Sequence, residues 1–348
     1  MRLRPQRPCA VTEPLPPNAF EPAPFHRGTF HNASGREKHG LANVLRWLLT
    51  RSPGPWPTHV EDVQVAPPAD RVDDGSVRAT IIGHATVLVQ VAGLNVLTDP
   101  VMSARIGPTP WTGPKRVRPP AVPFEAIPRI DVVLLSHDHY DHLDRPTLRR
   151  LAARDDPLVL TGKRVGRKVP SRRIVELDWW ESHALGAGLS ATYVPAEHFS
   201  GRGLFDRDKS LWGGFVLETP HGKVYFAGDT ARGVHFRAIR ERFGPMTLSL
   251  LPIGAYAPRW FMERVHMDPD EALHASLTLE SQTSLAIHFA TFNLADDSYD
   301  APTRALARAV SQLSGSPPGS DFRVTPFGEA TIVRPGEDLD AGARRRYA

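Results

Sequence analysis

Cysteine is almost absent from this chain, since Cys9 is the only one among 348 residues. A single cysteine excludes an internal disulfide and a thiolate metal cluster, and it fits a reducing compartment. Long apolar runs are also missing, because none approaches the roughly 20 residues of a transmembrane helix. The chain begins with arginines among prolines and lacks the apolar segment of a signal peptide. We therefore expect a cytosolic protein and leave open its association with the inner face of a membrane.

Net charge is small as well, at +4 from 42 basic and 38 acidic residues. Because the sequence has no long basic stripe, nucleic acid is not expected as a partner. Basic residues do gather in one stretch that contains no acid, formed by Lys163, Arg164, Arg167, Lys168, Arg172 and Arg173. We interpret this stretch as the solvated face of a helix, with a patch that attracts phosphates or anionic lipid as the alternative.

Composition divides the chain into three parts. Residues 1–75 form an extension rich in proline and polar residues, with one amphipathic helix at about 40–51. We expect this helix to pack on the main domain, with a membrane-surface helix as the alternative. Its apolar face consists of Leu41, Val44, Leu45, Leu48 and Leu49. Residues 76–335 form the main domain, and residues 336–348 form a loose tail.

The spacing of apolar residues predicts the elements of the main domain. Strands are expected at 79–82, 86–91 and 94–98, with Gly93 in a tight hairpin turn. Helices are expected at 233–243, 268–279 and 303–313. Hairpins followed by mixed strands and helices favour two packed sheets with helices outside.

Four candidate metal ligands stand close together directly after one apolar run. The run Ile130–Leu135 predicts a buried strand, and the residues that follow it include His137, His139, Asp141 and His142. Side chains two positions apart on an extended segment point the same way, so His137 and His139 can bind one ion. Imidazole and carboxylate are ligands that zinc accepts well. The pattern therefore predicts a metal site at the end of a strand.

This His-x-His-x-Asp-His pattern resembles the signature of the metallo-β-lactamase superfamily. Three later predicted strand ends complete the resemblance, with His198, Asp229 and His288. It implies an αββα sandwich, in which two mixed β-sheets carry helices on their outer faces. It also implies two zinc ions, one on His137, His139 and His198, the other on Asp141, His142 and His288, with Asp229 bridging them.

Longer stretches resemble one branch, the N-acyl-phosphatidylethanolamine-hydrolysing phospholipase D family. The matching stretches are Gly83–Thr86, Leu97–Pro100, Gly113–Arg116, Glu176–Glu181, Pro252–Met262 and His266–Ala272. The resemblance implies hydrolysis of N-acyl-phosphatidylethanolamine to N-acylethanolamine and phosphatidic acid by a metal-bridging hydroxide. His139 favours this hydrolytic chemistry, because flavin-linked di-iron relatives have Glu at that position.

The resemblance also implies roles for residues around the metals. Asp141 and His266 are the catalytic candidates, and His266 would bind the phosphate or donate a proton to the leaving group. Tyr140 and Tyr256 are expected to contact substrate. Arg259 is expected either to contact the phosphate or to form a buried ion pair. His84 and Asp99 are expected to orient ligand histidines.

Two other functions fit the same ligands. One is a lactonase or esterase of a small polar, phosphorylated metabolite, which would need a polar pocket. The other is a non-catalytic binding module stabilised by metal. Seven candidate ligands argue against the module, because structural zinc sites are usually closed and mononuclear. A phospholipid substrate is the expected partner, and a homodimer is left open.

Overall fold

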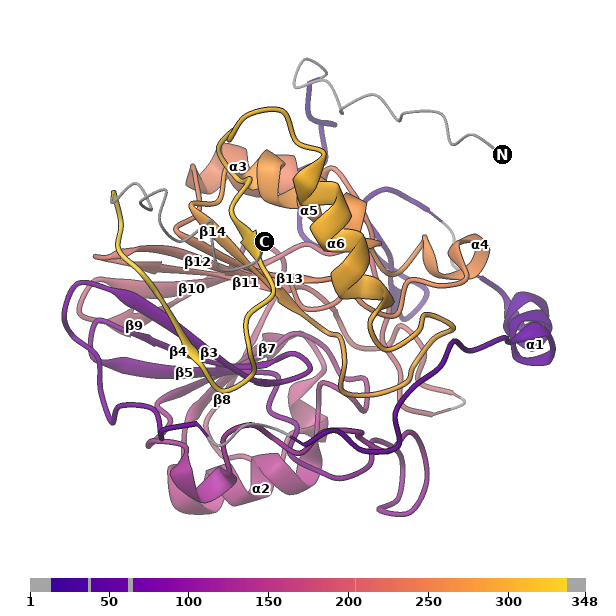
Figure 1. The fold of residues 1–348 in the computed structure, drawn as a ribbon, viewed down its shortest axis with the longest axis horizontal. Helices are drawn as coiled ribbons and strands as arrows, with labels where there is room; N and C mark the ends of the chain where they lie inside the picture. Colours follow the sequence, from indigo (N-terminus) through magenta and orange to yellow (C-terminus); the bar gives the residue numbers. More distant parts are fainter. Residues whose placement is uncertain (1–13, 37–38, 62–64, 204, 337–348) are drawn as a thin grey trace.

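Two seven-stranded sheets stack face to face in the computed structural model, which describes residues 14–36, 39–61, 65–203 and 205–336 (Figure 1). Cys9, the N-terminal arginines and most of the tail lie outside the described residues. In order across the first sheet, the strands are β16 (Ala330–Val333), β3 (Val77–Gly83), β4 (Thr86–Val91), β5 (Leu94–Thr98), β6 (Val132–Leu135), β7 (Leu158–Gly162) and β8 (Ile174–Leu177). The second sheet contains β15 (Phe322–Arg323), β14 (Thr283–Ile287), β13 (Leu248–Pro252), β12 (Gly222–Phe226), β11 (Gly214–Thr219), β10 (Leu189–Val194) and β9 (Ser182–Gly186).

Both sheets are mixed and follow the same pairing scheme. Strands β16 to β5 pair antiparallel and β5 to β8 pair parallel. In the second sheet, β9 to β12 pair antiparallel and β12 to β15 pair parallel. The predicted hairpin turn joins β4 to β5, and both Ala92 and Gly93 have positive φ, as a two-residue type I′ turn requires. A separate hairpin pairs β1 (Phe25–His26) with β2 (Thr29–Phe30).

Helices cover the outer face of each sheet, which confirms the predicted αββα sandwich (Figure 1). Helix α2 (Arg145–Arg154) covers the first sheet, and α3 (His235–Phe243), α5 (Pro269–Leu279) and α6 (Ala301–Ser311) cover the second. Asp268 caps α5 in a capping box with Glu271. The short helices are η1 (Phe124–Ala126), η2 (Gly166–Lys168) and α4 (Arg259–Met262).

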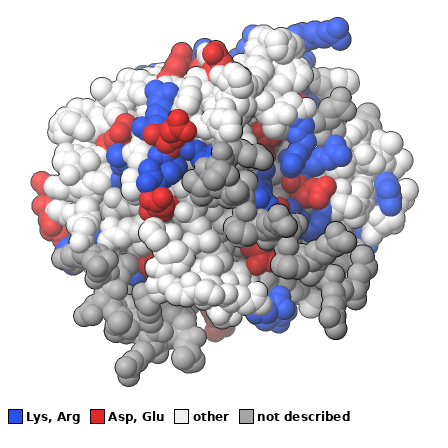
Figure 2. All heavy atoms as spheres, turned by 90° about the horizontal axis from the view of Figure 1, so that it is seen from above, with Lys and Arg blue, Asp and Glu red and all other residues white. Residues whose placement is uncertain are grey.

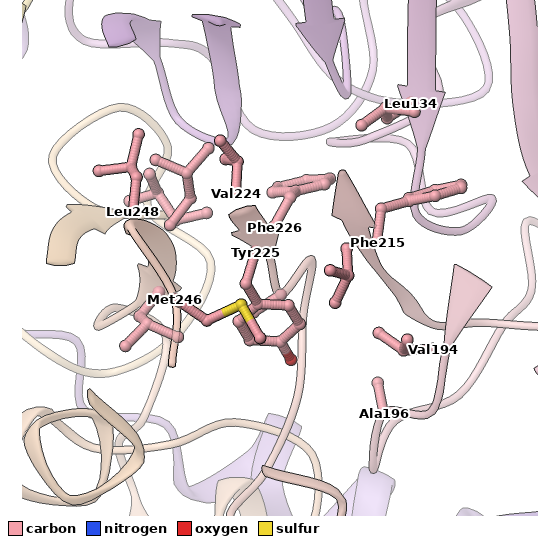
Figure 3. Close-up of a cluster of buried hydrophobic side chains, with 14 of the residues drawn as sticks. Leu134, Val194, Ala196, Phe215, Val224, Tyr225, Phe226, Met246 and Leu248 are labelled. Atoms are coloured by element: carbon pink, nitrogen blue, oxygen red, sulfur yellow. The ribbon is translucent and has the colours of Figure 1, made fainter. Parts of the chain in front are cut away.

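Side chains of one strand alternate between the inner core and the helix layer. On β12, Phe226 points toward the first sheet, where Leu134 lies, whereas Tyr225 points the other way (Figure 3). The ring of Tyr225 lies 6.3 Å from that of Phe236 in α3. Because both faces are buried, the central strands read as continuous apolar runs.

Helix α1 (Leu41–Thr50) lies at the side of the sandwich (Figure 1). Trp47 stacks on Phe261 at 4.9 Å and anchors the helix. The exposed fractions of Leu45, Leu48 and Leu49 are 57%, 55% and 77%. The apolar face that we expected to pack on the main domain therefore carries three leucines that face solvent. Trp47, which lies outside this apolar face, makes the contact with the main domain instead, because its ring stacks on Phe261 of α4.

Charged side chains are mixed on the surface. On the face shown in Figure 2, basic and acidic residues are interspersed. The basic stretch does not form a helix face, since only the three residues of η2 are helical there. Lys163 lies 2.8 Å from Asp178, and the guanidinium of Arg164 lies over the ring of Phe25. Within the described residues, no helix has both the length and the apolar character needed to span a bilayer.

Candidate metal centre

Four strand ends bring the predicted ligands together. His137 follows β6, His198 follows β10, Asp229 follows β12 and His288 follows β14. Backbone segments approach closely here: a Cβ at Gly228 would lie 2.6 Å from the Cβ of Ser136. Since the φ of Gly228 is also +60°, only glycine fits next to Asp229 without strain.

The first group of ligand atoms consists of His137, His139, His198 and Asp229, all within 4.8 Å of one another. Nε2 of His137 lies 2.8 Å from Nδ1 of His139, which lies 3.3 Å from Nε2 of His198. Nε2 of His198 lies 3.6 Å from Oδ2 of Asp229. Three imidazoles and a carboxylate thus converge on one point.

The second group consists of His84, Asp141, His142 and His288, again within 4.8 Å. Asp229 borders this group too, because Oδ1 lies 3.1 Å from Nε2 of His288 and Oδ2 lies 3.1 Å from Nε2 of His142. Asp229 therefore contacts both groups, which is the position that a bridging ligand requires.

These residues fit metal ions, as the buried polar atoms show. Within the described chain, Nε2 of His142, Nε2 of His288 and Oδ1 of Asp229 are buried without hydrogen-bond partners. An unsatisfied buried polar atom costs about 1–3 kcal/mol, and a coordinated cation would remove that cost. Imidazole and carboxylate donors suit zinc, iron or manganese.

Hydrogen bonds on the side away from the centre hold two of the ligand histidines, His142 and His198. Asp99 is fully buried, and its Oδ2 accepts hydrogen bonds from Ser136 Oγ at 2.6 Å and from His142 Nδ1 at 2.6 Å. Nδ1 of His198 lies 2.8 Å from the carbonyl oxygen of Val265. Nε2 of His84 lies 3.1 Å from Oδ2 of Asp141. The contacts of His142 and His198 fix the ring orientation and leave Nε2 facing the centre, whereas His84 orients the carboxylate of Asp141 and not a ligand histidine.

Protonation differs between the two groups. Burial holds the pKa values of His137, His139 and His198 below the usual range, so these imidazoles are neutral. Burial also opposes protonation of His288, but Asp229 and Asp141 raise its pKa to about 9. The carboxylates of Asp229, Asp141 and Asp99 likewise raise the pKa of His142 in spite of its burial. In the metal-free chain, protonated His288 and His142 therefore offset the negative charges of the neighbouring carboxylates.

Zinc binding at pH 7 is consequently expected to release about one or two protons per chain, because a pKa of about 9 leaves His288 protonated and a ligand must lose its proton. Isothermal titration calorimetry in buffers of different ionisation enthalpy measures this release. Binding heats that do not depend on the buffer would contradict the expectation. The same titration of His288→Gln should release fewer protons.

The predicted substrate residues lie at different distances from the ligands. Nδ1 of His266 lies 4.0 Å from Oδ2 of Asp229, and burial lowers the His266 pKa to about 4. The hydroxyl of Tyr140 donates to the carbonyl oxygen of Arg202 at 2.9 Å. Tyr256 is half-buried, and its pKa is raised to about 12 by burial and by Asp297, which belongs to neither group.

Arg259 forms internal contacts. Its guanidinium donates to the carbonyl oxygen of His266 at 2.9 Å and to Glu271 at 2.8 Å. The ion pair with Glu271 is present, although both side chains are partly exposed, and the bond to the carbonyl oxygen holds the backbone of His266. Contact of Arg259 with a phosphate stays a prediction.

Sequence reasoning missed a polar network behind the motif. Asp138 is fully buried between two ligand histidines, and its Oδ1 accepts from Gly201 N at 2.8 Å. Its Oδ2 accepts from Lys168 and from Ser210. Lys168 also bonds Asp206 at 2.8 Å. The sequence offers one signal of this network, an acidic residue between two ligand histidines that is not itself a ligand. That signal does not identify the partners of Asp138.

Comparisons with known proteins agree with this geometry. A family model described as "Beta-lactamase superfamily domain" matches residues 94–289. An uncharacterized protein of Mycobacterium tuberculosis is 38% identical over 82% of this chain and 77% of its own length. An N-acyl-phosphatidylethanolamine-hydrolyzing phospholipase D of Caenorhabditis elegans is 34% identical over 78% of this chain and 81% of its own length. The structure of Igni18, a metallo hydrolase from Ignicoccus hospitalis, covers 74% of this chain and 98% of its own, with a TM-score of 0.56; at 22% identity it shows a shared fold alone.

Proposed function

The chain belongs to the metallo-β-lactamase superfamily and is a metal-dependent hydrolase, and from this premise we propose a more specific activity. In this proposal the protein is a zinc-dependent phosphodiesterase of phospholipase D type, which hydrolyses N-acyl-phosphatidylethanolamine to N-acylethanolamine and phosphatidic acid. The observation that carries the proposal is the double group of ligands around Asp229, in a chain so similar to the nematode phospholipase D.

The ligand geometry suits attack on a phosphodiester. His137, His139 and His198 would hold one zinc ion, Asp141, His142 and His288 the other, and Asp229 would bridge them. Two such ions supply a hydroxide nucleophile near neutral pH and neutralise the phosphodiester oxygens. His266 is neutral at pH 7 and lies beside Asp229, so its ring N–H can donate to a phosphate oxygen.

Two partly buried aromatic side chains next to ligand histidines, Tyr140 and Phe199, support an acyl-chain substrate. Phe292 belongs to a small cluster with Val101 and Ile106, on which the partly buried Tyr140 and Leu294 pack. The ring of Phe199 lies 4.4 Å from that of His139. A small polar metabolite would gain little from aromatic neighbours, so these side chains favour the lipid over the lactone or ester.

Helix α1 offers a docking surface for a membrane beside this site. Trp47 and Val265 pack against the same buried cluster, formed by Ala255, Met262 and Ala295. The carbonyl of Val265 accepts from the ligand His198. The helix is therefore anchored next to the metal centre while its leucines face outward. We propose that this face enters the cytoplasmic surface of a membrane, from which the substrate would reach the centre.

Replacing Leu48 and Leu49 by glutamate should weaken binding to phospholipid vesicles by about tenfold or more, because burying one leucine contributes about 1.5–3 kcal/mol. Vesicle sedimentation measures the binding. Activity toward substrate dispersed in detergent micelles should fall much less. Thr50→Glu is the matched control, since Thr50 is exposed on the same helix. Equal vesicle binding by both variants would exclude α1 as the docking surface.

Product analysis tests the activity itself. Purified, zinc-loaded protein is incubated with N-acyl-phosphatidylethanolamine in mixed micelles, and the products are identified by mass spectrometry. N-acylethanolamine and phosphatidic acid are expected, and His137→Ala should form neither. A protein that binds two metals but forms no lipid product would favour the lactone or ester substrate.

A further inference from the structure

The segment after β2 runs against the metal centre although it lies outside the matched superfamily domain. Phe30 and Asn32 are each only 4% exposed. We propose that Asn32 is a positioning residue for His198, so that the N-terminal extension forms part of the metal centre. This inference rests on the metal centre proposed above.

Asn32 accepts two hydrogen bonds through one oxygen. The backbone N–H of His198 donates to Asn32 Oδ1 at 3.1 Å, and Nε1 of Trp212 donates to the same atom at 3.0 Å. Both partners are donors only, so the amide must present its oxygen to them. Trp212 is fully buried and also donates to the carbonyl oxygen of Ala196 at 3.0 Å. Asn32 and Trp212 together hold the turn that leads into His198.

His198 needs such support because it lies beyond the end of its strand. Strand β10 ends at Val194, and beyond it a single backbone bridge, in which Ala231 N donates to the carbonyl oxygen of Glu197 at 2.8 Å, leaves the N–H of His198 without an acceptor in the sheet. A buried N–H without an acceptor would destabilise the folded state. Asn32 supplies the acceptor from outside the sheet, while the carbonyl of Val265 holds the side chain.

Ser34 supports the same turn one residue earlier. Its hydroxyl donates to Oε2 of Glu197 at 2.5 Å, and its backbone N–H donates to Oε1 at 3.3 Å. Glu197 is only 4% exposed and adjoins His198, and its own N–H donates to Oγ1 of Thr230, which follows the ligand Asp229. The extension therefore contacts the loop that carries His198, and Glu197 of that loop contacts the loop that carries Asp229.

The test is metal affinity, measured by competition with a chromogenic chelator and by elemental analysis of bound zinc. Asn32→Ala should lower the affinity for one of the two zinc ions by about 10–100-fold, the range found when a residue that orients a ligand is removed. The absorption spectrum of the cobalt-substituted variant should change, since His198 would be displaced. Asn32→Asp keeps the acceptor oxygen and replaces only Nδ2, which has no partner within the described chain. Its affinities should stay within about threefold of wild type.

Asn18→Ala is the matched control, because Asn18 is an exposed asparagine of the same N-terminal extension, and its Nδ2 donates to the carbonyl oxygen of Ala33 at 3.3 Å. Wild-type metal affinities and cobalt spectrum in Asn32→Ala, with or without a lower melting temperature, would overturn the inference. Equal losses in Asn32→Ala and Asn32→Asp would overturn it too. If Asn32→Ala does not fold, Ser34→Ala is measured in its place. A lower affinity for one of the two ions would support the inference, and unchanged affinities would reject it. A wild-type protein that binds no metal would instead refute the proposed function.

Discussion

Replacing Asp229 by asparagine is expected to reduce hydrolysis by on the order of 10³-fold, equivalent to about 4 kcal/mol of transition-state stabilisation. The carboxylate lies within 3.1 Å of His142 and His288 and 3.6 Å from His198, so one substitution affects both ligand groups. An amide would carry no charge to offset bound metal cations and could present only one oxygen to them. The measurements are the specific activity and the zinc content per chain.

Asp300→Asn is a suitable control for this variant. Asp300 forms an exposed ion pair with Arg304, with side-chain exposures of 51% and 65%, and such pairs contribute little. Its activity and zinc content should match wild type. Two zinc ions bound with wild-type affinity in Asp229→Asn would show that Asp229 does not bridge the centre.

Lys168→Met is expected to lower the free energy of unfolding by about 3–5 kcal/mol, because it leaves a buried charge without its counterion. Burial alone would raise the pKa of Asp138, but His139, Lys168 and Ser210 hold it below its ordinary value, so the carboxylate is ionised. Lys168 forms an ion pair with this carboxylate. Urea denaturation of the metal-free protein measures the loss.

A second substitution separates this charge effect from lost packing. Lys168→Met combined with Asp138→Asn should recover part of the stability, because the buried charge is then removed together with its partner. Lys209→Met is the control, since Lys209 is exposed nearby. A double variant no more stable than Lys168→Met would attribute the loss to packing.

The ligand motif could be predicted because its chemistry is local in the sequence. His137, His139, Asp141 and His142 lie within six residues, and the apolar run before them predicts the strand that positions them. The later ligands were found through the superfamily pattern, since a single His or Asp at a strand end carries little signal. The sandwich followed from the order of hairpins and helices. The domain boundaries at 75 and 336 stay a prediction.

Contacts between distant segments could not be predicted in the same way. The hydrogen bonds of Asn32 reach partners 166 and 180 positions away, and no sequence period encodes such a distance. Periodicity showed that α1 has an apolar face, but it could not reveal that Trp47, outside that face, finds a stacking partner in Phe261. Likewise, the basic stretch gave no indication that Lys168 pairs with Asp138.

The ligands come from both layers of the sandwich, since β6 belongs to the first sheet and β10, β12 and β14 belong to the second. Metal ions held between them would cross-link the two halves of the chain. The full set of ligands comes together only when the two sheets are docked. Because metal binds the native state, chelation should make the junction between the sheets more susceptible to proteases. The same ions would thus both take part in catalysis and hold the two sheets together.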